Sequence, residues 1–320
     1  MQRRGNESGL PKGEKGALMF SSASDEIELD IETIEQNGAL YAEANFDSRV
    51  EALDHIEFHL IERIEGLLRT AHSTHPPEKL LALKRRAQSL KRRLEAIDDA
   101  LFRRLRADIR TGAALKDLID DYVGRDTRGR RPHAAMGYDT LDLFINGLLL
   151  TQAIPTETKT REPEMVYYQQ TPARIILDLL EKAHLTPDDV LFDLGSGLGH
   201  VPILVNLLSG AAVRGIEFEP AYCAYASRCA ADLNLSRVTF IQADARSADY
   251  AEGTVFFMYT PFVGRILQDV LEKLRGEAGR KKIRLFTYGP CTPDVSRQSW
   301  LMSEDPRGDP LYELGVFRSR

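Results

Sequence analysis

The chain has 320 residues, of which 43% are hydrophobic and 28% charged, and its formal net charge is −6. This length favours two domains, and the acidic balance argues against a general nucleic-acid-binding protein. No apolar run approaches the roughly 18 residues of a membrane span, the basic start lacks the apolar stretch of a secretory signal, and the three cysteines show no metal-ligand spacing. We therefore expect a cytoplasmic protein with no membrane partner and no metal site.

Helices are predicted throughout the N-terminal half. Residues 1–24 are rich in glycine, serine, lysine and glutamate, which is typical of a disordered tail. Apolar residues then recur three or four positions apart, which indicates two long helices on either side of a breaker at 70–77. These residues are Val50, Leu53, Leu60, Ile64 and Leu67 in the first helix, and Leu80, Leu83, Ala87, Leu90, Leu94, Ile97, Leu101 and Leu105 in the second. With shorter helices near 113–123 and 140–150, the pattern predicts a helical domain over 25–150 that contains an antiparallel hairpin.

Charge is divided unevenly between the two long helices. Residues 25–65 hold 13 acidic residues against two arginines, whereas residues 84–110 hold ten lysines or arginines against four acidic residues. The basic helix could bind nucleic acid, but we favour pairing of the acidic helix with the basic one, because the acidic partner lies so close in the chain. His55 and His59 are spaced for a metal ion, yet no HExxH pattern surrounds them, and a salt-bridged helix surface is the favoured interpretation.

The domain boundary is predicted at residues 151–163. This stretch is polar and contains Pro155 and Pro163, which favours a linker. The second domain would then span 164–320.

The most informative stretch of the chain is 190–200, which reads VLFDLGSGLGH. It predicts a buried strand that ends near Asp193, a turn with three glycines at alternate positions, and a helix that begins near His200. The glycines are Gly195, Gly197 and Gly199. Glycine lets a ligand approach the backbone closely, and the helix N-terminus points its N–H groups at the same place. The stretch therefore predicts a nucleotide-like cofactor site at the carboxyl edge of an open sheet.

Further strands are predicted downstream. The stretch 212–219 ends in acidic residues, and Glu217 lies close to the position, about 20 residues after the glycine turn, where a Rossmann-type sheet places its ribose-binding acid. The stretch 238–244 ends in Ala243 and Asp244, and 254–262 opens into a turn. Strands that alternate with helices of this length predict an α/β fold with a doubly wound, Rossmann-like sheet. Residues 282–288 would form the fifth strand, and 300–302 and 311–317 a terminal hairpin.

The spacing of the glycines distinguishes between cofactors. His200 stands where a dinucleotide-binding GxGxxG motif would have its last glycine, which disfavours an NAD-dependent oxidoreductase. The D-x-G-x-G-x-G pattern instead resembles motif I of the class I S-adenosylmethionine (SAM)-dependent methyltransferases. The resemblance implies SAM as the cofactor and a seven-stranded methyltransferase sheet, whose reversed strand would come from the terminal hairpin.

A narrower resemblance covers residues 166–275. This region resembles the catalytic domain of the telomeric-silencing type of histone lysine methyltransferases, which lack a SET domain. The run FDLGSGLG and the Gly-Ile-Glu at 215–217 are near matches to the family. Tyr168, Gln170 and Thr171 align with the family's tyrosine, glutamate and threonine, in a loop that closes over the cofactor.

The site residues follow from the motif and the resemblance together. The expected cofactor-binding residues are Tyr168, Gln170, Thr171, Asp193, Gly195, Ser196, Gly197, Gly199, Glu217, Phe218, Ala243 and Asp244. Among these, Asp193 and the glycines would hold the methionine end of SAM, Glu217 the ribose and Asp244 the adenine. Methyl transfer also needs an aligned, unprotonated acceptor. The candidate catalytic residues are therefore Tyr259, Thr260 and His200, which are expected near the acceptor.

The acceptor side departs from the family. Gln170 and His200 replace a glutamate and a glutamine, and residues 259–261 replace the family's Asn-Asn-Phe. Against the Asn-Pro-Pro-Tyr box of amide and base N-methyltransferases, only Pro261 and the aromatic Phe262 survive. Histone specificity therefore does not carry across.

Three functions remain open at this point. The first is methyl transfer from SAM to a protein lysine or another amine. The second is a small-molecule or RNA methyltransferase. The third is a non-catalytic adaptor that binds the cofactor, and the intact glycine motif argues against it.

Overall fold

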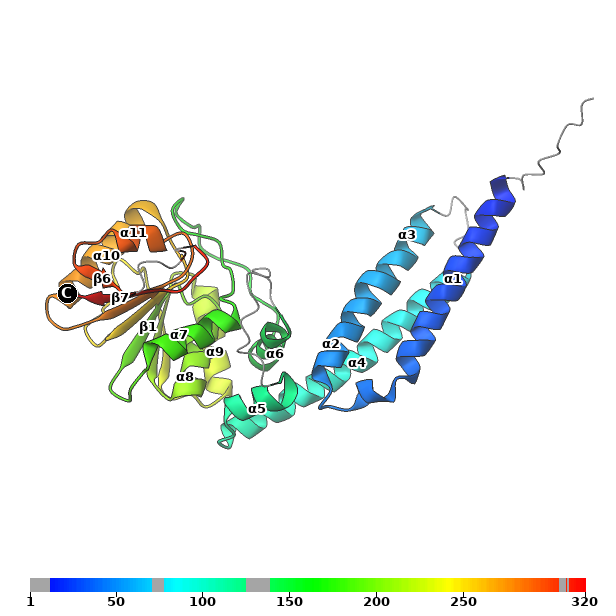
Figure 1. Ribbon diagram of the computed structural model, residues 1–320, viewed down its shortest axis with the longest axis horizontal. Helices are drawn as coiled ribbons and strands as arrows, with labels where there is room; N and C mark the ends of the chain where they lie inside the picture. Colours follow the sequence, from blue (N-terminus) through cyan, green and yellow to red (C-terminus); the bar gives the residue numbers. More distant parts are fainter. Residues whose placement is uncertain (1–11, 71–77, 125–138, 305–308, 310) are drawn as a thin grey trace, which may run out of the picture. The chain divides into compact units, whose positions relative to one another are not determined.

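The computed structural model describes residues 12–70, 78–124, 139–304, 309 and 311–320 (Figure 1). Its contacts divide the chain into two compact units, residues 1–102 and 103–320. The division falls inside helix α4 (Glu78–Arg110), earlier than the predicted linker at 151–163. The reason is that two helices of the predicted helical domain, α5 (Leu115–Tyr122) and α6 (Thr140–Leu149), pack on helices of the second unit.

The predicted disordered tail is wrong for part of its length. Helix α1 spans Lys12–Gln36, so residues 12–24 are helical, whereas residues 1–11 lie outside the described part of the chain. Lysine, glutamate, alanine, leucine and methionine in this stretch are good helix formers, and the helix continues into a packed segment. Composition alone made the stretch resemble a tail.

The first unit is helical, as predicted. Besides α1 and α4 it contains η1 (Gly38–Tyr41), α2 (Phe46–Asp54), the π-helical η2 (His55–Ile61) and α3 (Glu62–Thr70). The predicted apolar stripes meet in one core, in which Leu60 and Ile64 lie with Leu83 and Leu90. Ile27 and Ile31 of α1 join this core, so the predicted hairpin has a third helix packed on it.

The acidic and basic helices of this unit pair with each other. Lys84 contacts Glu65 at 2.7 Å, and Lys91 contacts Glu57 at 2.8 Å. Arg86 contacts an α1 glutamate, Glu35, at 2.6 Å. These ion pairs agree with the interpretation favoured from the sequence.

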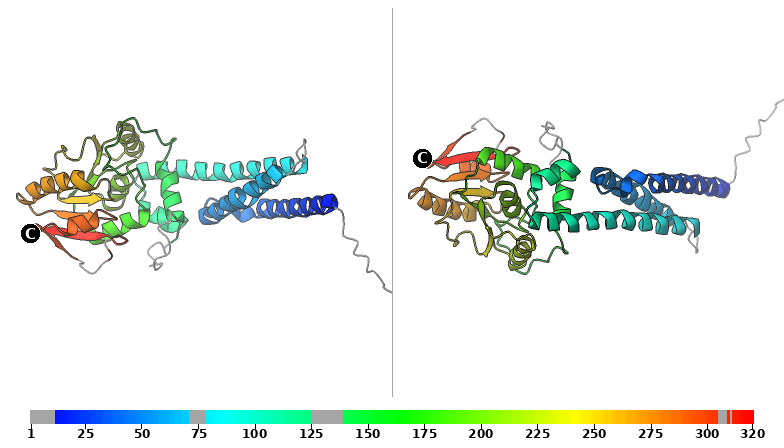
Figure 2. Two further views of the ribbon diagram at one scale, coloured as in Figure 1. Left: turned by 90° about the horizontal axis from the view of Figure 1, so that it is seen from above. Right: turned by 90° about the horizontal axis from the view of Figure 1, so that it is seen from below.

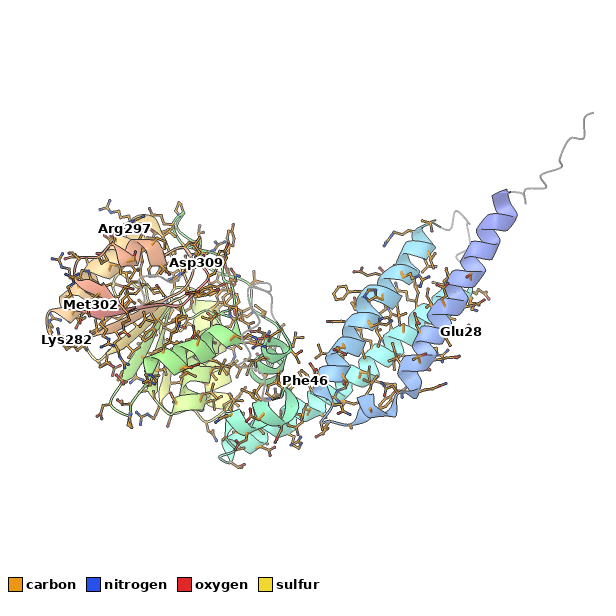
Figure 3. The ribbon with its side chains drawn as sticks, in the orientation of Figure 1. Glu28, Phe46, Lys282, Arg297, Met302 and Asp309 are labelled. Atoms are coloured by element: carbon orange, nitrogen blue, oxygen red, sulfur yellow. The ribbon has the colours of Figure 1, made fainter. Side chains whose placement is uncertain are left out.

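Two further contacts distinguish the helical unit. Arg49 is fully buried and contacts Asp98 at 2.7 Å. Phe46, which is labelled in Figure 3, packs edge-on against Phe102 with ring centroids 5.5 Å apart. Within the described residues, no group of three or more His, Cys, Asp or Glu side chains is arranged to hold a metal ion.

The second unit contains a seven-stranded sheet in the order β3-β2-β1-β4-β5-β7-β6. Its strands are β1 (Val190–Leu194), β2 (Ala212–Glu217), β3 (Val238–Gln242), β4 (Val255–Met258), β5 (Arg284–Thr287), β6 (Leu301–Ser303) and β7 (Gly315–Ser319). The first five strands are parallel, and β7 pairs antiparallel with both β5 and β6. This is the predicted doubly wound sheet with a reversed strand, although the last strand begins four residues later than expected.

Helices cover both faces of this sheet (Figures 1 and 2). They are α7 (Ala173–Ala183), α8 (His200–Ser209), α9 (Pro220–Asp232), α10 (Gly264–Ala278) and the short α11 (Thr292–Ser296). The chain leaves β1 through α8 toward β2, and leaves β4 through α10 toward β5, in the opposite direction. Adjacent strands whose crossovers diverge in this way open a crevice at their carboxyl ends, which is where open α/β sheets bind ligands. None of the helices in the described ranges combines the length and the apolar character that a membrane crossing needs.

Candidate functional site

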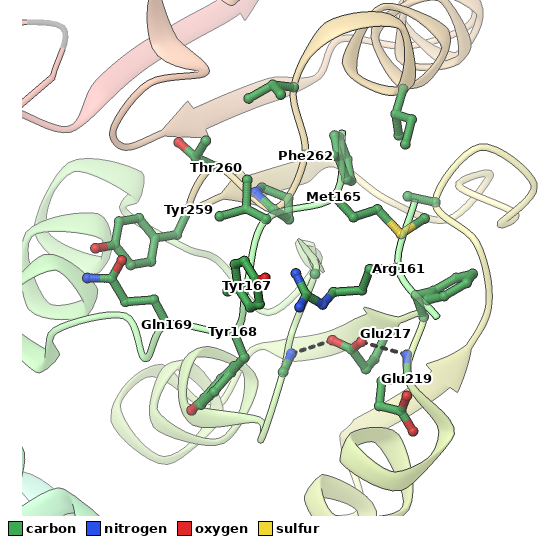
Figure 4. Close-up of a pocket in the computed structure, with 18 of the residues that line it drawn as sticks. Arg161, Met165, Tyr167, Tyr168, Gln169, Glu217, Glu219, Tyr259, Thr260 and Phe262 are labelled. Atoms are coloured by element: carbon green, nitrogen blue, oxygen red, sulfur yellow. Dashed lines mark hydrogen bonds between the residues drawn. The ribbon is translucent and has the colours of Figure 1, made fainter. Parts of the chain in front are cut away.

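A cavity of about 500 Å³ lies at the carboxyl edge of the sheet (Figure 4). Its volume falls in the range of about 300–1,000 Å³ that is usual for small-molecule and cofactor sites. The predicted residues that line it are Tyr168, Gly195, Gly197, Glu217, Phe218, Ala243, Asp244, Tyr259 and Thr260. The turns after β1, β2, β3 and β4 therefore meet at this cavity.

The glycine turn after β1 is held in a conformation that other residues rarely adopt. Gly195 has a φ of +85° and Gly197 a φ of +52°. A Cβ atom added to Gly195 would lie 2.3 Å from Pro261, and one added to Gly197 would lie 2.4 Å from the Tyr168 ring. The glycines are thus required by the backbone conformation and by neighbours that press directly on the turn.

Glu217 joins the ends of the first two strands. Its carboxylate accepts hydrogen bonds from the backbone N–H groups of Gly197 and Glu219, each at 2.7 Å (Figure 4). Burial raises the pKa of Glu217, although these donors oppose the shift. Asp193 lies behind the cavity lining, and burial together with the nearby Glu217 raises its pKa well above the usual value.

The predicted linker is part of the site, which corrects its assignment as a connection alone. Thr158 donates to Glu219 from its hydroxyl at 2.6 Å and from its backbone N–H at 2.9 Å, and the Lys159 N–H donates at 2.8 Å. Burial would raise the pKa of Glu219, but these donors and the Ala221 N–H lower it to about 2. The anchored segment brings Glu157 and Arg161 to the cavity wall.

The segment that follows crosses the end of β4. The Val166 N–H donates to the Pro261 carbonyl at 3.0 Å, and Met165 forms an isolated β-bridge with Phe262. The Glu164 carboxylate accepts from the Ile266 N–H at 2.9 Å in the first turn of α10. These contacts fix the chain that leads into Tyr168 over the sheet edge.

Asp244 is held by an ion-pair network. Arg246 contacts the Asp244 carboxylate at 2.6 Å and also pairs with Glu162. The hydrogen bond from Arg246 lowers the pKa of Asp244, so this wall of the cavity carries a carboxylate of fixed position.

Six of the predicted site residues do not line the cavity; they are Gln170, Thr171, Asp193, Ser196, Gly199 and His200. His200 is 3% exposed, and its Nε2 lies 2.9 Å from the Asn146 Oδ1 atom. Burial lowers its pKa to about 4, so the ring is neutral. The structure therefore places His200 behind the cavity wall, and not at the acceptor position expected for a general base.

The acceptor side is built from the turns after β4 and β5. The rings of Tyr259 and Tyr288 lie 5.5 Å apart, and both line the cavity. The Thr260 hydroxyl donates to the Tyr288 carbonyl at 2.8 Å and accepts from the Cys291 N–H at 3.2 Å. Thr260 has a φ of +40°, a strained conformation for a β-branched residue, and both bonds serve to hold the two turns together.

The other residues that line the cavity were not among those predicted from the sequence. Three of them are tyrosines from distant parts of the chain, Tyr222, Tyr288 and Tyr312. Of these, only Tyr288 had a local signal, because it is the last residue of the predicted fifth strand. Tyr167, with 74% of its surface exposed, stacks its ring under Arg161 at 3.4 Å from the guanidinium carbon to the ring centroid.

The charge and shape of the cavity fit SAM. Four acidic side chains line it, whereas Arg161 is the one cationic residue among its described lining residues and is itself paired with Glu157 at 3.0 Å. A cavity of negative charge suits a sulfonium cofactor, and the carboxylate of Glu217 is placed to accept hydrogen bonds from ribose hydroxyls.

One family of known proteins matches the part of the sequence that forms this site. A sequence model of the family described as "Histone methylation protein DOT1" matches residues 161–262, which confirms the resemblance predicted from the sequence. Among curated proteins, none matches the chain.

Similar solved structures include two methyltransferases. An RNA methyltransferase from Salinibacter ruber, in complex with S-adenosyl-L-homocysteine, is 27% identical; the match covers 47% of this chain and 92% of that one, with a TM-score of 0.36. A putative SAM-dependent methyltransferase from Methanococcus maripaludis is 15% identical over 46% of this chain and 83% of that one, with a TM-score of 0.37.

Proposed function

Because the protein is a SAM-dependent methyltransferase that resembles the DOT1 catalytic domain over residues 161–262, we propose that it methylates the side-chain amine of a protein lysine. The observation that carries this proposal is the wall of the cavity. Of the 11 tyrosines in the chain, six line it, and they surround a cavity in which acidic residues outnumber the one cation. Tyrosine faces and negative charge together attract an alkylammonium group.

The cofactor is assigned to the residues at the strand ends. In this proposal Gly195 and Gly197 receive the methionine end, Glu217 accepts from the ribose hydroxyls, and Phe218 with Asp244 borders the adenine. SAM supplies an electrophilic methyl group on a sulfonium, so the protein has to align the acceptor and exclude water. The residues packed behind the wall, including Asp193, Ser196, Gln170 and Thr171, support this surface.

The acceptor is assigned to the side of Tyr259 and Tyr288. Their rings can hold an incoming ammonium, and its nitrogen becomes nucleophilic once the ammonium has released its proton to solvent. In this proposal the Tyr259 hydroxyl contacts the acceptor nitrogen. Thr260 has a positioning role for Tyr259, because the Thr260 hydroxyl is already engaged in hydrogen bonds with the Tyr288 carbonyl and the Cys291 N–H.

A protein acceptor is favoured over RNA by the fate of the basic helix. Lys84, Arg86 and Lys91 are engaged by carboxylates of neighbouring helices, which reduces the cationic surface left for phosphates. Exposed apolar side chains at the cavity mouth, such as Tyr167 and Leu311, suit a polypeptide that surrounds the acceptor lysine.

We also propose that the protein acts in the cytoplasm.

The test is transfer of radiolabelled methyl groups from SAM into a host-cell lysate. We expect label that protease removes and nuclease leaves, and acid hydrolysis of the labelled protein should release methyl-lysine. The variant Tyr259→Phe should lower the rate with the fold unchanged. Label in nucleosides or in the low-molecular-weight fraction would contradict the proposal, and SAM binding without any transfer would favour the adaptor.

A further inference from the structure

A buried histidine links the cavity wall to a helix behind it. His200 begins α8, and both of its ring nitrogens face polar atoms of other elements. Its Nε2 lies 2.9 Å from the Oδ1 atom of Asn146 on α6, and its Nδ1 lies 3.5 Å from the Tyr168 hydroxyl. Because the side chain is 3% exposed, it is shielded from solvent that could replace either partner.

The donor and acceptor directions along this array are fixed by chemistry. An amide oxygen only accepts, so the Nε2 atom of His200 carries the proton and donates to Asn146. The Nδ1 atom of a neutral ring with that tautomer only accepts, and the Tyr168 O–H therefore donates to it. Asn146 thereby selects the tautomer that can receive Tyr168.

Tyr168 is the member of the array that reaches the cofactor site. Its ring lies so close to Gly197 that an added Cβ would come within 2.4 Å, and it packs against Tyr222 with centroids 5.4 Å apart. Tyr168, Gly197 and Tyr222 all line the cavity. A rotation of the Tyr168 ring would change the wall next to the glycine turn, and a rigid wall binds its ligand with less loss of entropy.

We propose that Asn146 and His200 are positioning residues that act in series to hold Tyr168 against the glycine turn, and so set the affinity for SAM. Neither residue lines the cavity, and neither takes part in proton transfer during methylation. His200 accepts a hydrogen bond from the Tyr168 hydroxyl, and Asn146 orients the His200 ring.

Four substitutions separate this role from simple packing. His200→Gln keeps a donor and an acceptor at the position, and the resembling family carries glutamine there, so SAM affinity should stay within about twofold. His200→Leu and Asn146→Leu each remove one link and should weaken SAM binding about tenfold, the size of one internal hydrogen bond. Tyr168→Phe removes only the hydroxyl and should give a similar loss.

The experiment is calorimetric titration with SAM and, separately, with S-adenosylhomocysteine, alongside the melting temperature of each variant without ligand. Because the residues act in series, the double variant Asn146→Leu/His200→Leu should bind no more weakly than His200→Leu alone. Asn206→Ala is the matched control: it removes a hydrogen bond to the Ala211 carbonyl at the other end of α8, at 2.8 Å, and should lower stability without changing affinity.

Three outcomes would overturn the proposal. They are an unchanged affinity in folded His200→Leu, full additivity in the double variant, and a loss in His200→Gln as large as in His200→Leu. If His200→Leu fails to fold, Asn146→Leu and Tyr168→Phe decide the question by the same measurement.

Discussion

At the scale of single residues, Glu217 makes the sharpest prediction. Its carboxylate is held by two backbone N–H groups and lines the cavity where the ribose is proposed to lie. Glu217→Ala should weaken SAM binding by about 1–3 kcal/mol, because charge-assisted hydrogen bonds to the ligand are lost. Calorimetric titration checks this. Glu252→Ala, which removes an exposed partner of Arg214 on the same sheet, should leave the affinity unchanged.

His200 makes a prediction about pH and stability. Its pKa is about 4 in the folded protein because of burial, against 6.5 for an ordinary histidine. Between these values the unfolded chain binds more protons than the folded one, so the free energy of unfolding rises with pH across this window. The wild type should lose about 3 kcal/mol more than His200→Gln between pH 7 and pH 4. Urea unfolding at several pH values measures the difference, and parallel curves for the two proteins would contradict the assignment.

The residues that were predicted from the sequence and line the cavity share a simple property. Gly195, Gly197 and Glu217 directly follow or end predicted strands, so a local pattern placed them at the sheet edge. Glu157 and Tyr312 reach the same cavity from segments far away in the chain, where only tertiary packing decides the neighbours. His200 shows the opposite error: its position beside the motif was right, but its orientation toward Asn146 depended on a helix that the motif does not contain.

At the scale of elements, the turn between β1 and α8 depends on glycine for two separable reasons. Gly197 and Gly210 flank the two ends of α8, and both have positive φ, +52° and +72°. An added Cβ at Gly197 would collide with Tyr168, whereas at Gly210 it would meet nothing within 4 Å. Backbone strain is therefore common to both positions, and the collision belongs to Gly197 alone.

Alanine at these two positions should separate strain from site geometry. Gly210→Ala should lower stability by about 1–2 kcal/mol and leave SAM affinity unchanged. Gly197→Ala should show a similar loss of stability and, in addition, a loss of SAM affinity of at least tenfold, because Tyr168 must move. Denaturation and SAM titration of both variants give the comparison, and equal effects on affinity would contradict it.

Hydrophobic periodicity predicted most helices and strands correctly, whereas composition gave a wrong assignment for two stretches. The predicted strands and the helices around the glycine motif agree with the structure, because strands that are buried on both faces, such as β1 and β4, give continuous apolar runs in the sequence. Residues 12–24 are rich in glycine, serine, lysine and glutamate, and residues 151–163 are polar, so composition alone indicated a tail and a linker. The first is helical, and the second is fixed by hydrogen bonds to Glu219, a long-range contact that no local pattern encodes.

At the scale of the whole molecule, each compact unit has a hydrophobic core of its own. The cluster around Leu60 and Leu90 is drawn from residues before 103, and the cluster around Phe256 and Leu285 from residues after it. Units with separate cores can unfold as separate cooperative steps. Cofactor binding should then stabilise the unit that contains the cavity, residues 103–320.

Scanning calorimetry of the full chain tests this independence. S-adenosylhomocysteine at 100 times its Kd should stabilise one transition by about 2.7 kcal/mol and leave the other in place. Arg49→Met should shift the other transition, because Asp98 loses its buried partner, a change that costs about 3–5 kcal/mol. Arg63→Met, which breaks an exposed pair with Glu26, should cost less than about 1 kcal/mol. A single transition moved by both ligand and Arg49→Met would mean that the two cores unfold together, and the affinity for S-adenosylhomocysteine would then fall with any loss of the helical unit.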